Sequence, residues 1–265
     1  MNAVSSLRSE AESLFSSLTH QSEQITVKVS GKVSFAGIFT HTRELHVNPL
    51  LLITPDDLPP HLQVTGLEDP LLKLPQFFNV FKSWLAERFN LPPESLNDFE
   101  SLLLVHVEWW KSSALFQRTK KFILAHEIAH AYYMHVSIKW EKRWAALFAF
   151  PFVALAFLLF SGLECILISL GIYSIALKVF RAIRKYSDQH QEKTADLTAL
   201  HLTSDFPAAK NFFVGIKQMI QRAENQSTFF NKIIRVLFYP ETFLNLEHPS
   251  PQVRIQYLKE AALKA

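Results

Sequence analysis

The feature of this sequence that most limits its possible folds is an apolar stretch of 37 residues that runs from Trp144 to Phe180. Only Glu164 and Lys178 interrupt it with charge. The stretch is far too long for one core helix. One bilayer span needs about 20 apolar residues and two spans need about 40. Since the segments on either side are expected to meet at one site, we predict a helical hairpin that turns near residues 161–164.

Basic residues flank this stretch at both ends: Lys139, Lys142 and Arg143 precede it, and Lys178, Arg181, Arg184 and Lys185 close it. Both flanks are therefore expected on the cytoplasmic side of a membrane. Each arm has about 17 residues, or about 25 Å of helix, against a hydrocarbon core of about 30 Å. Local thinning, snorkelling lysines or a re-entrant path would accommodate the difference. A hairpin buried in protein, or a dimerisation arm, is the alternative.

A second constraint lies just upstream, where His126, Glu127 and His130 stand in the order H-E-x-x-H within an apolar helical pattern. Residues i and i+4 lie one turn apart on the same helix face. Both imidazoles can therefore reach one Zn²⁺, while Glu127 can take a proton from metal-bound water. An amphipathic helix with two incidental histidines is the alternative.

The identity of a third ligand separates the known classes of such sites. A metzincin would need Gly and His where Tyr133 and Val136 stand, so that class is excluded. A deformylase-like site would need a cysteine ligand, but the one cysteine, Cys165, lies inside the apolar stretch. A carboxylate from a separate helix remains.

Residues 191–200 supply such a helix, with Glu192 and Asp196 one turn apart on one face. Glu192 can bind the metal. Asp196 can orient a histidine ligand by a hydrogen bond, which ligating imidazoles usually require. A solvated acidic face beside Lys193 is the alternative.

Three motifs in this order resemble the signature of metallopeptidase family forty-eight: His126-Glu-Ile-Ala-His130, Glu192-Lys-Thr-Ala-Asp196 and His248-Pro-Ser-Pro-Gln-Val-Arg254. These gluzincins include HtpX-like membrane proteases and the CAAX prenyl proteases, and the resemblance covers residues 117–260. It implies that one zinc ion per chain is bound by two histidines and Glu192, with Glu127 as general base and Asp196 supporting a histidine.

The reaction implied is hydrolysis of peptide bonds. The oxyanion of its tetrahedral intermediate would be held by zinc and one further donor, for which His248, Arg254 and Tyr257 are the candidates. Arg254 could hold Asp196 or the substrate carbonyl, and a surface arginine is the alternative.

The competing hypothesis is a non-catalytic membrane scaffold in which zinc only pins two helices together. A structural site uses four protein ligands, whereas three ligands and an open position favour catalysis. HtpX-like proteases usually have an N-terminal transmembrane pair, which this sequence does not show. We therefore expect a different route of substrate delivery, and CAAX processing is disfavoured.

The fold class expected is α+β and mainly helical: a gluzincin-like catalytic domain, a small N-terminal β-sheet and the inserted apolar helical hairpin. Residues 1–100 are assigned to an N-terminal region and residues 101–265 to the peptidase domain, which residues 144–180 interrupt. The first 24 residues have helical apolar spacing rather than the apolar block of a signal peptide. Residues 25–30 and 33–39 predict a β-hairpin.

Further elements follow from local patterns. Residues 45–53 and 102–108 predict strands, and residues 77–89 a helix. Either residues 102–108 or residues 113–117 are candidates for an edge that pairs with substrate, and burial is favoured for the former. His106, within the former, is assigned to the core or surface rather than to a metal.

C-terminal helices are predicted from Pro207 to about Ala223, over residues 229–238, and from Pro251 onward with Ser250 as N-cap. On the last of these we expect one apolar face, which contains Ile255, Leu258 and Ala262.

Composition and charge limit the partners and the cellular location that we expect for the protein. The net charge of +3 is too small to indicate nucleic acid, and a single cysteine excludes a disulfide framework. We expect an integral protein of the bacterial inner membrane, with the metal site facing the cytoplasm, and with the lipid bilayer and a protein or peptide substrate as partners. His130 lies 14 residues before Trp144 and Glu192 lies 14 residues after Lys178. Two continuous helices would therefore hold the metal about 20 Å above the membrane boundary.

Overall fold

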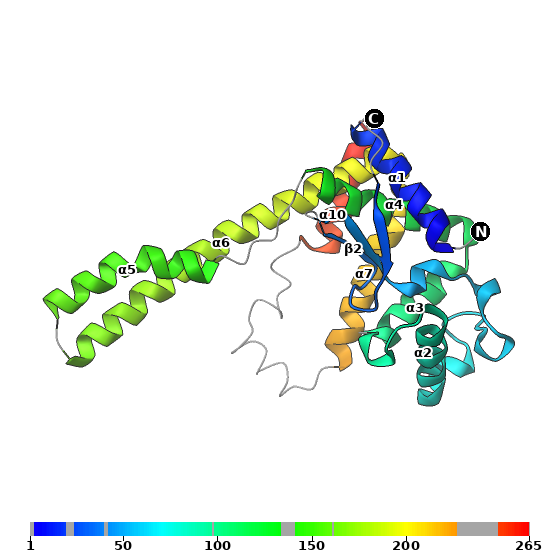
Figure 1. Cartoon of the computed structure of the whole chain (residues 1–265), viewed down its shortest axis with the longest axis horizontal. Coiled ribbons are helices and arrows are strands. Elements are labelled where there is room, and N and C mark those ends of the chain that lie inside the picture. Colours follow the sequence, from blue (N-terminus) through cyan, green and yellow to red (C-terminus); the bar gives the residue numbers. More distant parts are fainter. Residues whose placement is uncertain are drawn as a thin grey trace.

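The computed structural model describes residues 3–19, 24–39, 42–96, 98–133, 141–160, 162–226 and 249–264. It consists of a helical body and a long arm (Figure 1). The arm is formed by α5 (Glu141–Leu159) and the first half of α6 (Gly162–Thr203), and the second half of α6 runs into the body. The described residues are mainly helical with one small sheet, which confirms the predicted α+β class.

The body is organised around α4 (Ser113–Tyr132), which contacts helices from both ends of the chain. The N-terminal helix α1 (Ala3–Thr19) packs on α4 with its predicted apolar face, where Leu7, Ala11 and Phe15 are buried. From the other end of the chain, α6 and α7 (Phe206–Gln226) pack against α4. α10 (Pro251–Ala262) in turn packs against α6 and α7.

The three-stranded sheet has the order β1-β3-β2, so the predicted pairing of residues 25–30 with 33–39 is wrong. β3 (Glu44–Val47) lies in the middle, parallel to β1 (Thr26–Val29) and antiparallel to β2 (Ala36–Phe39). Gly31, in the turn after β1, lies against Ser95 and Leu96, and a Cβ there would be only 2.7 Å from the Ser95 carbonyl oxygen.

Residues 102–108 form part of α3 (Phe99–Trp110) and not a strand. This helix is buried on most sides, so its sequence lacks the polar face that would have revealed a helical period. The alternative substrate edge, residues 113–117, is the first turn of α4. Neither segment can therefore extend a sheet. His106 is a core residue, as predicted, because it is fully buried with Nδ1 2.8 Å from the Leu102 carbonyl oxygen.

The predicted helix over residues 77–89 is α2 (Pro75–Phe89), which ends at Asn90 in the left-handed conformation. The strand expected over residues 45–53 ends at Val47, because Pro49 begins a short 3₁₀-helix there. Proline also begins the other 3₁₀-helices described between the sheet and α3: Pro55–Asp57, Pro60–Leu62, Pro70–Lys73 and Pro93–Ser95.

α10 begins as predicted, with the Ser250 hydroxyl accepting a hydrogen bond from the Val253 backbone N–H. Its inward face differs from the prediction, because Arg254 and Leu258 are buried while Ala262 is exposed. The helix predicted over residues 229–238 lies outside the described residues.

In the arm, α5 and α6 pack side by side through small residues, with Ala145, Ala149 and Ala176 buried between them. Large apolar side chains point outward, among them Phe150, Phe157, Leu158, Leu163 and Leu167. α6 is long and apolar enough to cross a membrane, whereas the apolar helix over Arg143–Leu159 is shorter.

The arm is the apolar helical hairpin expected from the sequence, and α6 continues from it without a break to Thr203. α4 differs from the expectation that two continuous helices lead from the arm to the metal site. α4 ends at Tyr132 with Tyr133 as its C-cap, and residues 134–140, which precede α5, lie outside the described residues.

Gly215 lies where α7 packs closely on α3. A Cβ at Gly215 would lie 2.7 Å from the Trp109 ring and 2.8 Å from a Val105 methyl group. We expect Gly215→Ala to destabilise the protein by about 1–3 kcal/mol through overpacking. Thermal and urea unfolding would measure it. Gly171→Ala is the matched control, since open space surrounds that helical position. An equal loss in both variants would contradict this packing.

Candidate metal centre

The centre begins on α4, where the helical repeat places His126 and His130 one turn apart. Their Nε2 atoms lie 3.1 Å apart. Apolar residues of the same helix, including Phe122, Ile123 and Ala129, are fully buried, so the imidazoles are fixed by a helix that is itself fixed in the core. The two rings present their nitrogen atoms toward one point.

α6 supplies the third group. Oε2 of Glu192 lies 3.5 Å from Nε2 of His126, and Oε1 lies 3.6 Å from Nε2 of His130. A donor atom from each of the three side chains lies within 4.8 Å of the others. In a tetrahedral zinc site with bonds of about 2.1 Å, ligand atoms are about 3.4 Å apart. The donor set therefore fits a divalent metal ion such as zinc.

Asp196, one turn further along α6, is fully buried and anchors the centre. Its Oδ1 lies 2.9 Å from Nδ1 of His126. Arg254 on α10 donates from Nε to Oδ2 at 2.7 Å and from Nη2 to Oδ1 at 2.6 Å, and the Tyr257 hydroxyl also donates to Oδ2. This carboxylate therefore fixes the orientation of the His126 ring while its own charge is balanced.

Arg254 is not a surface residue, since its side chain is only 7% exposed. Besides its two bonds to Asp196, its Nη2 lies 2.9 Å from Oε2 of Glu192. Its guanidinium also stacks over the Phe213 ring, 4.3 Å from the centroid. Arg254 thus holds both Glu192, a candidate metal donor, and Asp196, which orients the His126 ring.

Burial and ion pairing oppose each other at these groups. Burial favours a lower pKa for His126, but hydrogen bonds to Asp196 and Glu192 raise the pKa to about 10. Burial likewise favours a higher pKa for Asp196, yet the Arg254 charge holds that pKa below its usual value. These directions describe the metal-free protein. A bound divalent cation requires neutral imidazoles, so binding would release protons.

Glu127 lies beside the histidines and faces the cleft. Burial raises its pKa to about 7, and the charge of His126 opposes that rise. Its carboxylate also accepts a hydrogen bond from the backbone of Ile38 in β2. The sequence did not predict this contact, because nothing in the apolar pattern of residues 33–39 indicates which strand edge meets α4.

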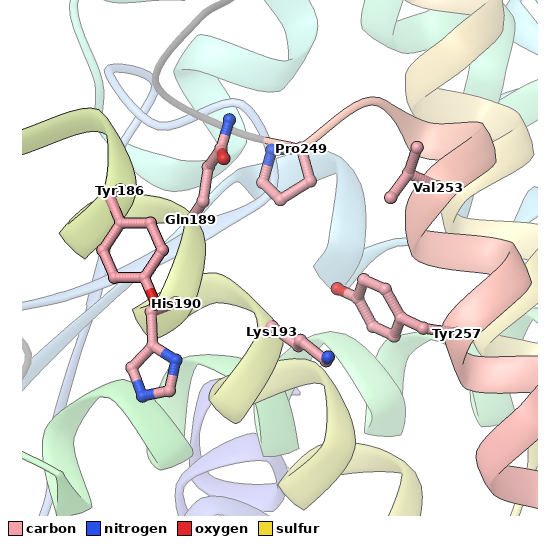
Figure 2. Close-up of a pocket in the computed structure, with 7 residues that line it drawn as sticks. All are labelled: Tyr186, Gln189, His190, Lys193, Pro249, Val253 and Tyr257. Carbon is pink, nitrogen blue, oxygen red and sulfur yellow. The ribbon is translucent and has the colours of Figure 1, made fainter. Parts of the chain in front are cut away.

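His126, Glu127 and Glu192 line a cleft of about 890 Å³. Its walls come from α6, from α7, and from the segment over residues 249–254, with Ser34 and Phe35 beside β2. Gln189, Pro249 and Val253 line this cleft and also a second groove of about 310 Å³ between α6 and α10. Figure 2 shows that groove, with Tyr186, His190 and Lys193 on the α6 side and Tyr257 on the α10 side.

The structure therefore brings together six of the candidate site residues from the sequence: His126, Glu127, His130, Glu192, Asp196 and Arg254. Tyr257 reaches Asp196 and not the cleft. His248 lies outside the described residues.

Because Arg254 neutralises buried carboxylates, its removal should be costly. We expect Arg254→Met to lower the free energy of unfolding by about 3–5 kcal/mol, since it leaves buried negative charge unpaired. Arg8→Met is the control, because Arg8 pairs with Glu12 at the surface and should contribute less than about 1 kcal/mol. Urea unfolding of both variants would measure the difference. Equal losses would mean that the buried pair does not stabilise the site.

Comparison with known proteins agrees with this geometry. The sequence model of peptidase family M48 matches residues 112–262. This range is more than half of the chain and contains every candidate donor of the centre. No curated protein and no solved structure matches the chain significantly. Metallopeptidases of this family depend on a metal, in agreement with the histidine and glutamate donors found here. The chain therefore belongs to peptidase family M48.

Proposed function

We propose that this protein is a membrane-associated, zinc-dependent endopeptidase. The observation that carries the proposal is the convergence of His126, His130 and Glu192 within 4.8 Å, with Glu127 beside them in an open cleft. Three donors leave one coordination position for water or substrate, which is the arrangement of catalytic zinc sites. The substrate would be a protein or peptide.

When bound, the ion would supply Lewis-acid chemistry, polarising a carbonyl oxygen and lowering the pKa of water. Glu127 would take the proton from the attacking water and later donate it to the leaving amine. Burial, which raises the pKa of Glu127, suits a group that must do both. Asp196 would keep His126 oriented throughout. Arg254 lines the cleft and has five N–H donors, so it can hold Asp196 and Glu192 and still be the candidate donor to the developing oxyanion. The Tyr257 hydroxyl has one donor, which Asp196 occupies.

β2 is the candidate edge for substrate binding. It is an outer strand of the sheet, it packs against α4, and the Ile38 backbone reaches Glu127. An exposed strand edge can bind an extended peptide through backbone hydrogen bonds. In this proposal residues 1–100 contribute a substrate edge to the peptidase domain of residues 101–265.

The arm supports the membrane part of the proposal. Its outward side chains are large and apolar, and its base is basic, with Arg143 on α5 and Lys178 and Arg181 on α6. This charge pattern favours a cytoplasmic position for the base. We propose an integral protein of the bacterial inner membrane. Because α6 is continuous from Lys178 to Glu192, the metal would lie about 20 Å above the boundary.

The alternative function, a membrane scaffold pinned by zinc, would need a closed site. Within the described parts of the chain, the candidate donor group contains three side chains, of which His126 and Glu192 line a cleft. Four protein ligands are typical of structural zinc. The open arrangement therefore favours catalysis.

Two substitutions would test the proposed chemistry. Glu127→Gln should abolish peptide hydrolysis, at least about a hundredfold, because the general base is lost while the metal donors stay. Glu192→Ala should lose bound zinc and activity together. Elemental analysis and a peptide-cleavage assay on the same samples would separate these effects. Full activity in Glu127→Gln, or stoichiometric zinc in Glu192→Ala, would contradict the assigned roles. Glu260→Gln on the exposed face of α10 is the control.

The height of the site above the bilayer has its own test. Proteoliposomes would carry single-span substrates with one cleavable segment placed at graded distances from the membrane. We expect cleavage to be most efficient about 20 Å from the boundary, on the cytoplasmic side. Cutting confined to the apolar span would contradict the proposed height.

A further inference from the structure

Two lysines in the cleft have no role in the chemistry described above. Lys185 on α6 and Lys217 on α7 are half-buried, and both line the cleft that contains Glu127 and Glu192. No salt bridge to either lysine is found among the residues that the structure describes. The other cation of the wall, Arg254, differs in this respect, since it is bound to two carboxylates. The cleft therefore has positive charge available to a ligand.

The lysines lie on different walls. Lys185 precedes Glu192 by seven residues on the same helix, which is two turns on one face and about 10 Å along the axis. Lys217 follows Phe213 by one turn on α7, and the Phe213 ring lies under the guanidinium of Arg254. α6 extends from the body into the arm, whereas α7 runs downward within the body in the view of Figure 1. A ligand at the metal donors would therefore have Lys185 on the α6 wall of the cleft and Lys217 on the α7 wall.

The intervening wall is apolar. Phe213, Ile216, Met219 and Ile220 of α7 line the cleft, and Val253 lines it from α10. An extended peptide advances about 3.3 Å per residue, so about 10 Å corresponds to three residues. An apolar side chain next to the reacting bond could pack on this wall while a side chain three residues away reaches a lysine.

We propose that Lys185 and Lys217 make the cleft select peptides that carry an acidic side chain about three residues from the cleaved bond. This inference rests on the proposed peptidase function and names the substrate class of that site. A carboxylate would complete an ion pair with a half-buried ammonium group, where screening by water is weaker than at an open surface. Unbalanced positive charge in a cleft also draws acidic ligands toward it.

The test compares paired peptides. Zinc-loaded full-length protein, in neutral detergent micelles without anionic lipid, is first given a randomised decapeptide library, and the cleaved bonds are read by mass spectrometry. Peptides are then made with Glu, Gln or Lys at the third position on each side of the best bond. We expect kcat/KM for Glu to exceed that for Gln on the order of fivefold at one of these positions, and the ratio to fall at high salt.

Variants assign the preference to the lysines. The ratio of Glu to Gln should fall to near one in Lys185→Gln/Lys217→Gln. It should invert in favour of the Lys peptide in Lys185→Glu/Lys217→Glu. Lys210→Gln is the matched control, because Lys210 is exposed on α7 and does not line the cleft, so the ratio should stay as in the unmodified protein. Circular dichroism would show that each variant is folded.

Other outcomes overturn the inference. A ratio of one in the unmodified protein, with cleavage that depends on Glu127, would reject the acidic preference and leave the peptidase function standing. No cleavage of any peptide above the Glu127→Gln background would reject both. If the lysine variants keep the ratio but bind less to vesicles that contain phosphatidylglycerol, the lysines contact lipid headgroups and the proposal is wrong.

Discussion

The structure of the centre depends on one buried charge, the carboxylate of Asp196. It contacts His126 on α4, and Arg254 and Tyr257 on α10, while it belongs to α6 itself. A buried carboxylate without partners would cost several kcal/mol. α4, α6 and α10 therefore cannot separate without exposing this charge to water or leaving it unpaired. The same contacts that hold the helices together also orient the histidine ring, so stability and metal-site geometry have one physical origin.

A second consequence follows from the continuity of α6. One helix of 42 residues carries the apolar half of the arm at one end and Glu192 with Asp196 at the other. If the arm lies in a bilayer, as we propose, the distance from membrane to metal is set by helix geometry and not by a flexible linker. Lys185 lies between these two regions, within the cleft and close to the basic base of the arm. The same helix therefore carries both the proposed membrane segment and one wall of the cleft that substrate would enter.

The features that the sequence predicted well are those set by spacing within a single helix. The H-E-x-x-H spacing on α4 and the Glu192–Asp196 spacing on α6 are fixed by the helical repeat. The two motifs were expected to meet because a metal held by two histidines needs a further ligand and a carboxylate that orients an imidazole. Contacts between elements were less predictable. The apolar pattern of each strand does not indicate which strand it pairs with, so the sequence did not predict that β3 lies between β1 and β2 or that Ile38 contacts Glu127. α3 is buried on most sides and gave no periodic signal that separates helix from strand.

The most direct test of the account is crystallography of the zinc-loaded protein with data collected at the zinc absorption edge. We predict one anomalous peak per chain, about 2.0–2.2 Å from Nε2 of His126, Nε2 of His130 and a carboxylate oxygen of Glu192. Arg254 should remain on Asp196 in that structure. A peak elsewhere, a fourth protein ligand that closes the site, or a Glu192 carboxylate turned away from both histidines would contradict the account.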